Sequence, residues 1–186
     1  MNLIRTISGL QAHTRLTHGH KSISSLVLGT KGIKIDPETI EINCLSFDEL
    51  DIHLLYSIMK IRQEIFIVEQ DCPYLDADGV DINSHHITLH SSKKLIAYTR
   101  IVPPGISYDK YSSIGRVVTN PKYRINGIGT KLMNYSIEKT KALYPIHKIK
   151  ISSQVYIKQF YANLGFKVVG EEYLEDDIPH IGMVFG

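Results

Sequence analysis

SIGRVVTNPKYRINGIGTKLMNYSIEKTKAL, residues Ser113–Leu143, is the stretch that decides the fold. It opens with a run rich in β-branched residues, which is typical of a buried strand, and Asn120-Pro121 ends that run. A loop with two glycines follows. The stretch therefore predicts a strand, a glycine-bearing loop and a helix in direct succession. Apolar residues recur at helical spacing in its last part: Ile128, Leu132, Met133, Ile137 and Leu143.

The loop of this unit has the chemistry to hold a pyrophosphate. Gly127 and Gly129 have no Cβ, so a phosphate can come close to the backbone N–H groups where the helix begins. The helix dipole favours negative charge at the same end, and Arg124 adds a mobile cation. No Gly-Lys-Ser/Thr follows the glycines, as a P-loop requires, and the Gly-x-Gly-x-x-Gly of a dinucleotide site is absent. A strand-to-helix turn without a ligand is the alternative for the loop taken alone.

Residues 1–38 differ from the rest of the chain. No Asp or Glu precedes Asp36, and the whole chain has a formal net charge of +2. A basic, serine-containing start without acids is typical of a mitochondrial presequence; a basic arm, or a start codon placed upstream of the true one, are the alternatives. We therefore separate this extension from a domain at residues 39–186. Five basic residues precede Asp36 and contribute +5, which leaves −3 for the remainder: Arg5, Arg15, Lys21, Lys31 and Lys34.

Residues 39–186 have the length of one domain with a sizeable core. Two cysteines, Cys44 and Cys72, are too few for a disulfide framework or a zinc site, which fits a reducing compartment. The near-neutral balance without a basic stripe argues against nucleic acid as a partner, and no apolar run approaches a membrane span. We therefore expect a cytoplasmic protein, or one of the mitochondrial matrix if the extension is a presequence.

Hydrophobic patterns predict the elements of this domain. Residues 40–45 alternate as a strand does, and residues 46–49 read as a capping box at the start of a helix. That helix has a broad apolar face: Leu54, Leu55, Ile58, Met59, Ile61, Ile65 and Phe66. The further elements are an antiparallel hairpin (86–90 and 95–102), a strand parallel to the central one (146–153), a short helix (154–163) and two final strands (166–173 and 181–185).

The helix exit and the loop after it carry charges with more than one interpretation. Arg62 and Glu69 can face a ligand as a pair, whereas Arg62 can equally form a salt bridge where the helix ends. Asp76, Asp78 and Asp81 resemble calcium ligands superficially. They lack the later ligands and the terminal Glu of an EF-hand loop, so we predict a solvated turn.

Two adjacent histidines, His85 and His86, open the next predicted strand. Side chains of neighbouring strand residues point to opposite faces, so these two cannot chelate one metal ion. We therefore predict no metal site.

Arg124-x-x-Gly-x-Gly129 between a strand and a helix resembles the acyl-CoA loop of the GNAT acyltransferase superfamily. FYANLGF at 160–166 resembles the second signature of that superfamily. More narrowly, IRQEIFIVEQDCPYLDADG, IGRVV and FYANLGF continuing to EDDIPHIGM are similar to the ElaA-type branch, and together they cover residues from about 41 to 186. One departure concerns the loop. Ile125 and Asn126 stand where the superfamily commonly has Arg/Gln-Gly, so the outer phosphate contact is expected to differ.

The resemblance implies an α/β fold of the GNAT N-acyltransferase type, with a mixed central sheet of six to seven strands flanked by helices. It also implies transfer of an acetyl group from acetyl-CoA to an amine by direct attack, without a metal. Tyr161 matches the general acid that protonates the leaving thiolate, and a backbone N–H near Val118 would stabilise the oxyanion. Glu69 and His180 are the candidates for the base. The residues implied for the donor site are Val117, Val118, Thr119, Arg124, Ile125, Asn126, Gly127, Ile128, Gly129 and Thr130.

Two other functions remain open at this point. A module that binds acyl-CoA without turnover would use the same loop, and retention of Tyr161 disfavours it. An autoinducer-synthase-like acyltransferase is the second, because Arg62, Phe66 and Glu69 faintly resemble that group. The acceptor, a small-molecule or peptide amine, depends on variable loops, and a homodimer is possible.

Overall fold

The structure is a computed structural model that describes Ile35 and residues 39–186. The expectations for residues 1–38, an arm or a presequence, fall outside the described residues except at Ile35. No helix within the described part is long and apolar enough to cross a bilayer.

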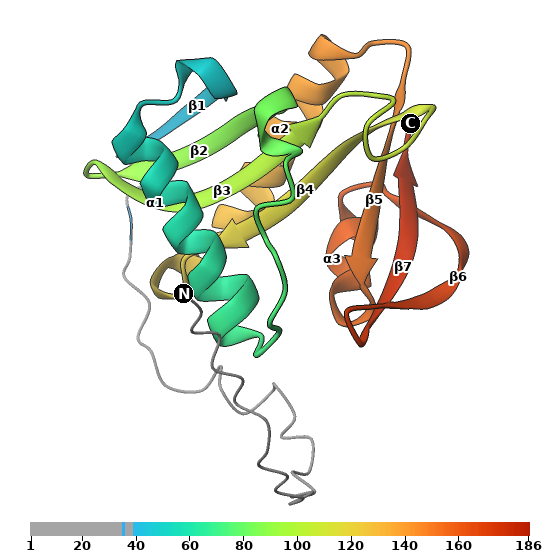
Figure 1. The fold of residues 1–186 in the computed structure, drawn as a ribbon. Coiled ribbons are helices and arrows are strands. Elements are labelled where there is room, and N and C mark those ends of the chain that lie inside the picture. The colour runs from blue at the N-terminus through green and yellow to red at the C-terminus, as the bar shows by residue number, and fades with distance from the viewer. Residues whose placement is uncertain (1–34, 36–38) are drawn as a thin grey trace, which may run out of the picture. The chain divides into compact units, whose positions relative to one another are not determined.

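A mixed sheet of seven strands organises the described domain, as predicted (Figure 1). The strands lie in the order β1-β2-β3-β4-β5-β7-β6. Neighbours are antiparallel except β4 and β5, which are parallel because a helix crosses between them. The strands are β1 (Ile40–Ser46), β2 (His85–Ser91), β3 (Lys94–Val102), β4 (Tyr111–Thr119), β5 (Lys148–Gln154), β6 (Lys167–Glu175) and β7 (Ile178–Phe185).

Within the described residues, three α-helices flank the sheet: α1 (Ile52–Arg62), α2 (Ile128–Leu143) and α3 (Lys158–Asn163). Figure 1 shows α1 across one face of the sheet and α2 on the other. The core follows this arrangement, since α1 packs Ile58 and Ile61 against Tyr98 and Val118 in a smaller cluster of buried residues. The larger cluster joins α2 to β2, β3, β5 and β7, and α2 contributes Ile128, Leu132, Met133 and Ile137 to it.

The start of α1 differs from the prediction. Glu49 does accept hydrogen bonds from the backbone N–H and the hydroxyl of Ser46, at 2.7 and 2.8 Å, but this pair precedes only a 3₁₀ helix, Phe47–Glu49. The N-cap of α1 is Asp51, whose carboxylate accepts from the N–H groups of His53 and Leu54. The predicted capping box therefore exists but belongs to the short helix before α1, and Asp51 caps α1 itself.

The end of α1 also differs. The apolar face continues to Phe66 as predicted, but regular α-helix stops at Arg62 and a π-helical segment, Gln63–Glu69, follows. Ile65 in this segment is buried against the α1 cluster. The loop that follows this segment lies beside β4, since Asp76 and Asp78 bond Arg116 on that strand.

β4 and β5 separate soon after they begin. They pair only from Tyr111–Ser113 to Lys148–Lys150, although β4 runs on to Thr119 and β5 to Gln154. The two strands therefore diverge, and the second half of β4 has an edge without a partner strand on the β5 side (Figure 1).

Candidate active site

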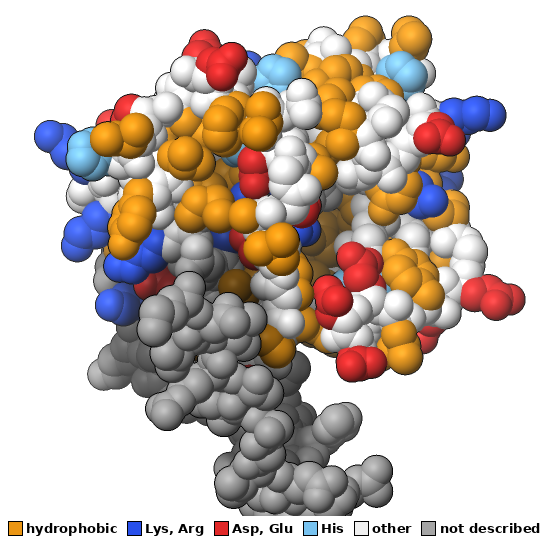
Figure 2. All heavy atoms as spheres, viewed as in Figure 1, with side chains coloured by type: hydrophobic (Ala, Val, Ile, Leu, Met, Phe, Trp, Pro, Cys, Tyr) orange, Lys and Arg blue, Asp and Glu red, His pale blue; other side chains and the backbone are white. Residues whose placement is uncertain are grey.

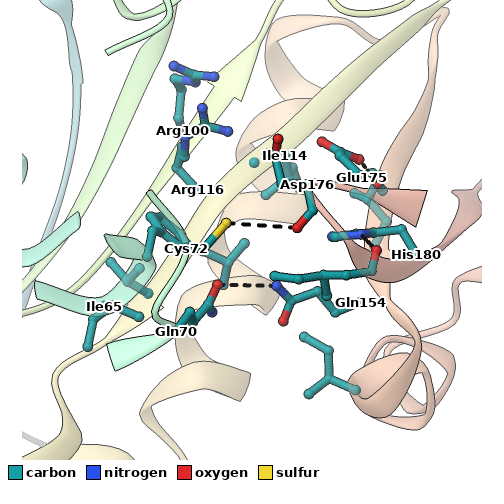
Figure 3. Close-up of a pocket in the computed structure, with 18 of the residues that line it drawn as sticks. Ile65, Gln70, Cys72, Arg100, Ile114, Arg116, Gln154, Glu175, Asp176 and His180 are labelled. Carbon is teal, nitrogen blue, oxygen red and sulfur yellow. Dashed lines mark hydrogen bonds between the residues drawn. The ribbon is translucent and has the colours of Figure 1, made fainter. Parts of the chain in front are cut away.

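A cleft of about 870 Å³ lies where β4 and β5 diverge. One wall comes from the segment after α1 and from β4, and the other from the end of β5, α3 and the β6–β7 hairpin. Figure 2 shows the face seen in Figure 1, with acidic side chains over the β6–β7 hairpin. Figure 3 shows two contacts across the cleft: Gln154 donates to Gln70 at 3.3 Å, and the Cys72 thiol lies 4.0 Å from the carbonyl of Asp176.

The N-terminus of α2 lies at this cleft. Pro121–Asn126 form a 3₁₀ helix, and Gly127 then adopts φ 66°, a left-handed conformation that suits glycine and lets α2 begin at Ile128. The first hydrogen bond of α2 runs from the N–H of Lys131 to the carbonyl of Gly127, at 3.0 Å. The N–H groups of residues 128–130 therefore have no partner within the helix. A Cβ on Gly129 would lie 3.7 Å from both Phe160 and Thr119. The site therefore fits a phosphate group held by backbone N–H donors.

Arg124 is not a free cation in this structure. Its guanidinium lies 2.8 Å from the carboxylate of Glu69 and donates at 3.2 Å to the carbonyl of Thr119. Both side chains of the ion pair are partly exposed and both residues line the cleft. Glu69 therefore holds Arg124 beside the start of α2, and it does not pair with Arg62.

The predicted donor residues divide into three groups. Val117, Val118, Thr119, Arg124 and Gly129 line the cleft. Ile128 is buried in the core, so only its backbone can contact a ligand, while Gly127 and Thr130 are exposed beside the lining residues. Ile125 and Asn126 belong to the 3₁₀ helix that leads into the loop.

The register of β3 and β4 defines which backbone groups face the cleft. Ala97 lies opposite Thr119, and the N–H of Asn120 donates to Ile96 at 2.9 Å. Hydrogen-bonded pairs alternate along an antiparallel ladder, so the N–H of Val118 points to Tyr98 on β3 and the N–H of Thr119 points away from β3. The donor near Val118 that faces the cleft is therefore a neighbouring N–H, such as that of Thr119.

Tyr161 is buried, with 7% of its surface exposed, and its ring meets Phe160 and Phe166 edge-on. Burial, with a smaller contribution from Tyr156, raises the pKa of Tyr161, so the phenol keeps its proton at neutral pH. The residue still lines the cleft.

His180 lies on β7 at the opposite wall (Figure 3). Its ring stacks on that of Tyr173. Its Nδ1 lies 2.8 Å from the carbonyl of Ile178. A carbonyl only accepts, so Nδ1 carries the proton in the neutral ring and Nε2 keeps a lone pair. This tautomer is the one that can accept a proton at Nε2.

The predicted solvated turn at residues 76–81 is wrong. Asp76 and Asp81 are buried, with 3% and 8% exposed, because three arginines surround the loop. Arg62, which is fully buried, bonds both at 2.8 and 2.7 Å, so its salt bridge at the helix end is observed. We call the six residues the Arg–Asp cluster. It comprises Arg62, Arg100, Arg116, Asp76, Asp78 and Asp81.

Sequence reasoning anticipated a salt bridge for Arg62 but missed its acidic partners and the other two arginines, Arg100 and Arg116. Arg62 interrupts the apolar face of α1 and Arg100 stands inside a hydrophobic strand, and a charge at such a position is a sign of a buried partner. His86 also contacts the cluster, since its Nε2 lies 3.1 Å from the carbonyl of Asp81. Burial lowers the pKa of His86, so this ring is neutral.

Arg116 occupies an unusual backbone conformation. Its φ of 53° is left-handed, which costs a residue with a side chain about 1–2 kcal/mol. It is the extra residue of a β-bulge, because Tyr98 pairs with Val118 whereas Arg100 pairs with Gly115. The guanidinium bonds Asp76 at 2.7 Å and Asp78 at 3.1 Å.

Comparison with known proteins agrees with this architecture. Residues 77–185 match the family model described as an acetyltransferase (GNAT) domain. The chain belongs to the GNAT family. Within it, the ElaA protein of Escherichia coli K12 is 36% identical over 146 residues, which cover 77% of this chain and 95% of ElaA. This likeness confirms the ElaA-type branch of GNAT proteins predicted from the motifs.

Solved structures confirm the GNAT fold. Escherichia coli ElaA aligns with a TM-score of 0.74 at 34% identity, and so does an acyl-CoA N-acyltransferase from Pseudomonas aeruginosa at 35%. Each alignment covers 79% of this chain and 99% of the other. The acyl-homoserine lactone synthase BjaI aligns with a TM-score of 0.62 at 15% identity over 78% of this chain and 82% of BjaI, which shows a shared fold alone.

Proposed function

We propose that this GNAT protein transfers an acetyl group from acetyl-CoA to an amine. The observation that carries the proposal is the meeting of three features in one cleft: the N-terminus of α2, the unpaired edge of β4 and Tyr161. The first suits the pyrophosphate of the donor, the second offers backbone donors to an acyl oxygen, and the third suits a leaving thiolate. Arg124 would add a charge-assisted contact to the pyrophosphate on leaving Glu69.

The reaction is a direct attack of the amine on the thioester. Negative charge develops on the acyl oxygen in the tetrahedral intermediate, where an N–H of β4 such as that of Thr119 stabilises it. The C–S bond then breaks, and the proton of Tyr161 passes to the departing thiolate. Burial, together with the carboxylates of Asp176 and its neighbours, raises the pKa of Cys72 in the same cleft. Its thiol therefore stays protonated and is a weak nucleophile, which supports direct transfer over an acylated cysteine.

Two residues compete for the role of base. His180 presents a free lone pair at Nε2, whereas Glu69 is engaged with Arg124. We therefore assign the amine proton to His180 and the positioning of Arg124 to Glu69. His180→Gln should lower kcat with unchanged donor affinity, and Glu69→Gln should leave kcat nearly unchanged while it releases Arg124 towards the donor. A large loss of kcat in Glu69→Gln with normal activity in His180→Gln would reverse the assignment.

The experiment that tests the proposed function is thiol release from acetyl-CoA in the presence of a panel of amines. Release that depends on the amine, together with an acetylated product by mass spectrometry, supports the proposal. Tight binding of acetyl-CoA in calorimetry, without thiol release in the presence of any amine, favours the second function, a module that binds acyl-CoA without turnover. Longer acyl-CoA donors belong in the same panel, because an autoinducer-synthase-like enzyme would prefer them.

The cellular location and the oligomeric state extend the proposal. We propose a cytoplasmic protein, with the mitochondrial matrix as the alternative if residues 1–38 act as a presequence. Localisation of the full chain and of a chain that begins at residue 39, each with the same fluorescent tag, separates the two. Sedimentation of the purified protein tests the proposed homodimer.

A further inference from the structure

Arg116 combines a costly backbone conformation with a tightly held side chain. Its φ of 53° belongs to a position where bulges often carry glycine, yet an arginine stands here. The guanidinium bonds two carboxylates, those of Asp76 and Asp78, and its carbon lies 5.6 Å from the ring centre of Tyr74 and 6.0 Å from that of Phe66. These contacts come from residues far away in the sequence, so tertiary structure maintains this conformation.

The bulge lies in the part of β4 that has separated from β5. Pairing with β5 ends at Ser113, and residues 117–119 beyond the bulge line the cleft. One extra residue on β4 shifts the alternation of its N–H groups by one position relative to β3. The bulge at Arg116 therefore decides which N–H groups beyond it face the cleft.

Arg116 also differs from the other two arginines of the Arg–Asp cluster. Only 0% and 4% of the Arg62 and Arg100 side chains are exposed, while 22% of the Arg116 side chain is exposed at the cleft. Asp76 keeps a bond to Arg62, and Asp78 keeps one to Arg100, if Arg116 is removed. The fold can therefore lose this guanidinium without leaving a buried carboxylate unpaired.

We propose that Arg116 is a positioning residue for acyl transfer: its guanidinium, fixed by Asp76 and Asp78, holds the β4 bulge and so aims the cleft-facing N–H groups beyond the bulge, such as that of Thr119, at the acyl oxygen. It acts through the backbone and does not itself touch the acyl group. The inference rests on the proposed function, because the oxygen in question is that of the bound acyl-CoA. Small errors in such an alignment are costly, since a displacement of about 1 Å can lower a rate by about 10²-fold.

The test compares Arg116→Gly with a matched control. Glycine accepts the left-handed conformation without strain, so the variant removes the anchor and leaves the backbone free. Lys93 has φ 64° in the exposed β2–β3 turn, and Lys93→Gly makes the same backbone change at a residue that does not line the cleft. We expect Arg116→Gly to lower kcat by on the order of 10²-fold, the scale of a lost oxyanion donor, with KM for acetyl-CoA little changed. Lys93→Gly should keep the wild-type kcat.

Chemical rescue distinguishes positioning from general stability. Guanidinium ion at low millimolar concentration can occupy the site of the missing side chain between Asp76 and Asp78, and should recover part of kcat in Arg116→Gly alone. An amide readout needs no turnover. In nitrogen-15 spectra, the amide chemical shifts of acetyl-CoA-bound and CoA-bound wild type should differ at Val117, Val118 and Thr119. This shift difference should shrink in Arg116→Gly and return when guanidinium is added.

Two results would overturn the inference. One is a wild-type kcat in Arg116→Gly together with an unchanged amide difference. The other is a loss of activity that only follows the loss of folded protein by circular dichroism and that guanidinium does not relieve. Absence of turnover in the wild-type protein would instead reject the proposed function, and the amide comparison would still decide whether Arg116 orients β4.

Discussion

The Nε atom of Arg62 lies 2.8 Å from a carboxylate oxygen of Asp76, and the two side chains are exposed to only 0% and 2%. A buried ion pair of this kind contributes modestly as a whole, yet loss of one partner leaves an uncompensated charge in the interior. The Arg–Asp cluster thus joins α1, the 70–81 loop, β3 and β4 through buried ion pairs, and the fold depends on these pairs staying complete. Two of the four predictions below depend on the cluster, and the other two depend on the cleft that it borders.

Arg62→Ala should destabilise the fold by about 3–5 kcal/mol, because Asp76 and Asp81 would each lose a partner in a buried site. Urea unfolding followed by circular dichroism measures the change. Lys60→Ala is the matched control two residues earlier, since its ion pair with Glu64 is exposed and 3.8 Å long. The control should stay within about 0.5 kcal/mol of the wild type. Equal effects of the two substitutions would contradict the role of the cluster.

Stability should fall in acid as Asp78 and Asp81 take up protons, because the pKa of each is lowered in the folded protein. Burial by itself would raise the pKa of Asp78, but hydrogen bonds from Arg100 and from the N–H of Val80, with the charges of Arg100 and Arg116, lower it to about 2. The folded pKa lies below the unfolded value of about 3.9, so this stabilisation is complete above pH 4 or so and is lost as pH falls towards 2. Unfolding measured from pH 5 to pH 2 should show a shallower decline in Asp78→Asn. If stability declines with pH equally steeply in Asp78→Asn and in the wild type, Asp78 does not contribute to the loss of stability in acid.

Gly129→Val should weaken the binding of acetyl-CoA. The new side chain would begin 3.7 Å from Phe160 and Thr119 and would fill the space beside the first N–H groups of α2. Calorimetry of donor binding measures the loss, and thermal unfolding shows whether the fold persists. Asn134→Val places the same side chain at an exposed position of the same helix and should bind as the wild type does. Unchanged affinity in a folded Gly129→Val protein would reject the donor loop.

Tyr161→Phe should lower kcat by on the order of 10²-fold while KM for acetyl-CoA stays nearly constant, because the hydroxyl is needed only as the thiolate leaves. The ring contacts with Phe160 and Phe166 remain, so packing is preserved. Single-turnover kinetics should accompany the assay, since product release can hide a slower chemical step. Tyr56→Phe, at an exposed site of α1, serves as the control. A wild-type rate in both assays would make the Tyr161 hydroxyl structural.

The amino-acid sequence by itself determined the elements and the family. Strand alternation, the helical period after Gly127 and the FYANLGF motif are local patterns, and each follows from side chains within a few residues of one another. The error at the start of α1 is local too, because the capping box at Ser46 begins only a 3₁₀ helix and Asp51 caps α1 itself.

Only the tertiary structure decided the chemistry of the charged residues. Asp76 and Arg116 stand forty positions apart in sequence, and no local pattern indicates that they bond at 2.7 Å. The same is true of Glu69 and Arg124, which are separated by fifty-five positions and meet at the donor loop. Coulomb attraction and desolvation act through space, so their outcome depends on which strands lie side by side. The divergence of β4 from β5, which makes the cleft, is likewise a property of the whole sheet.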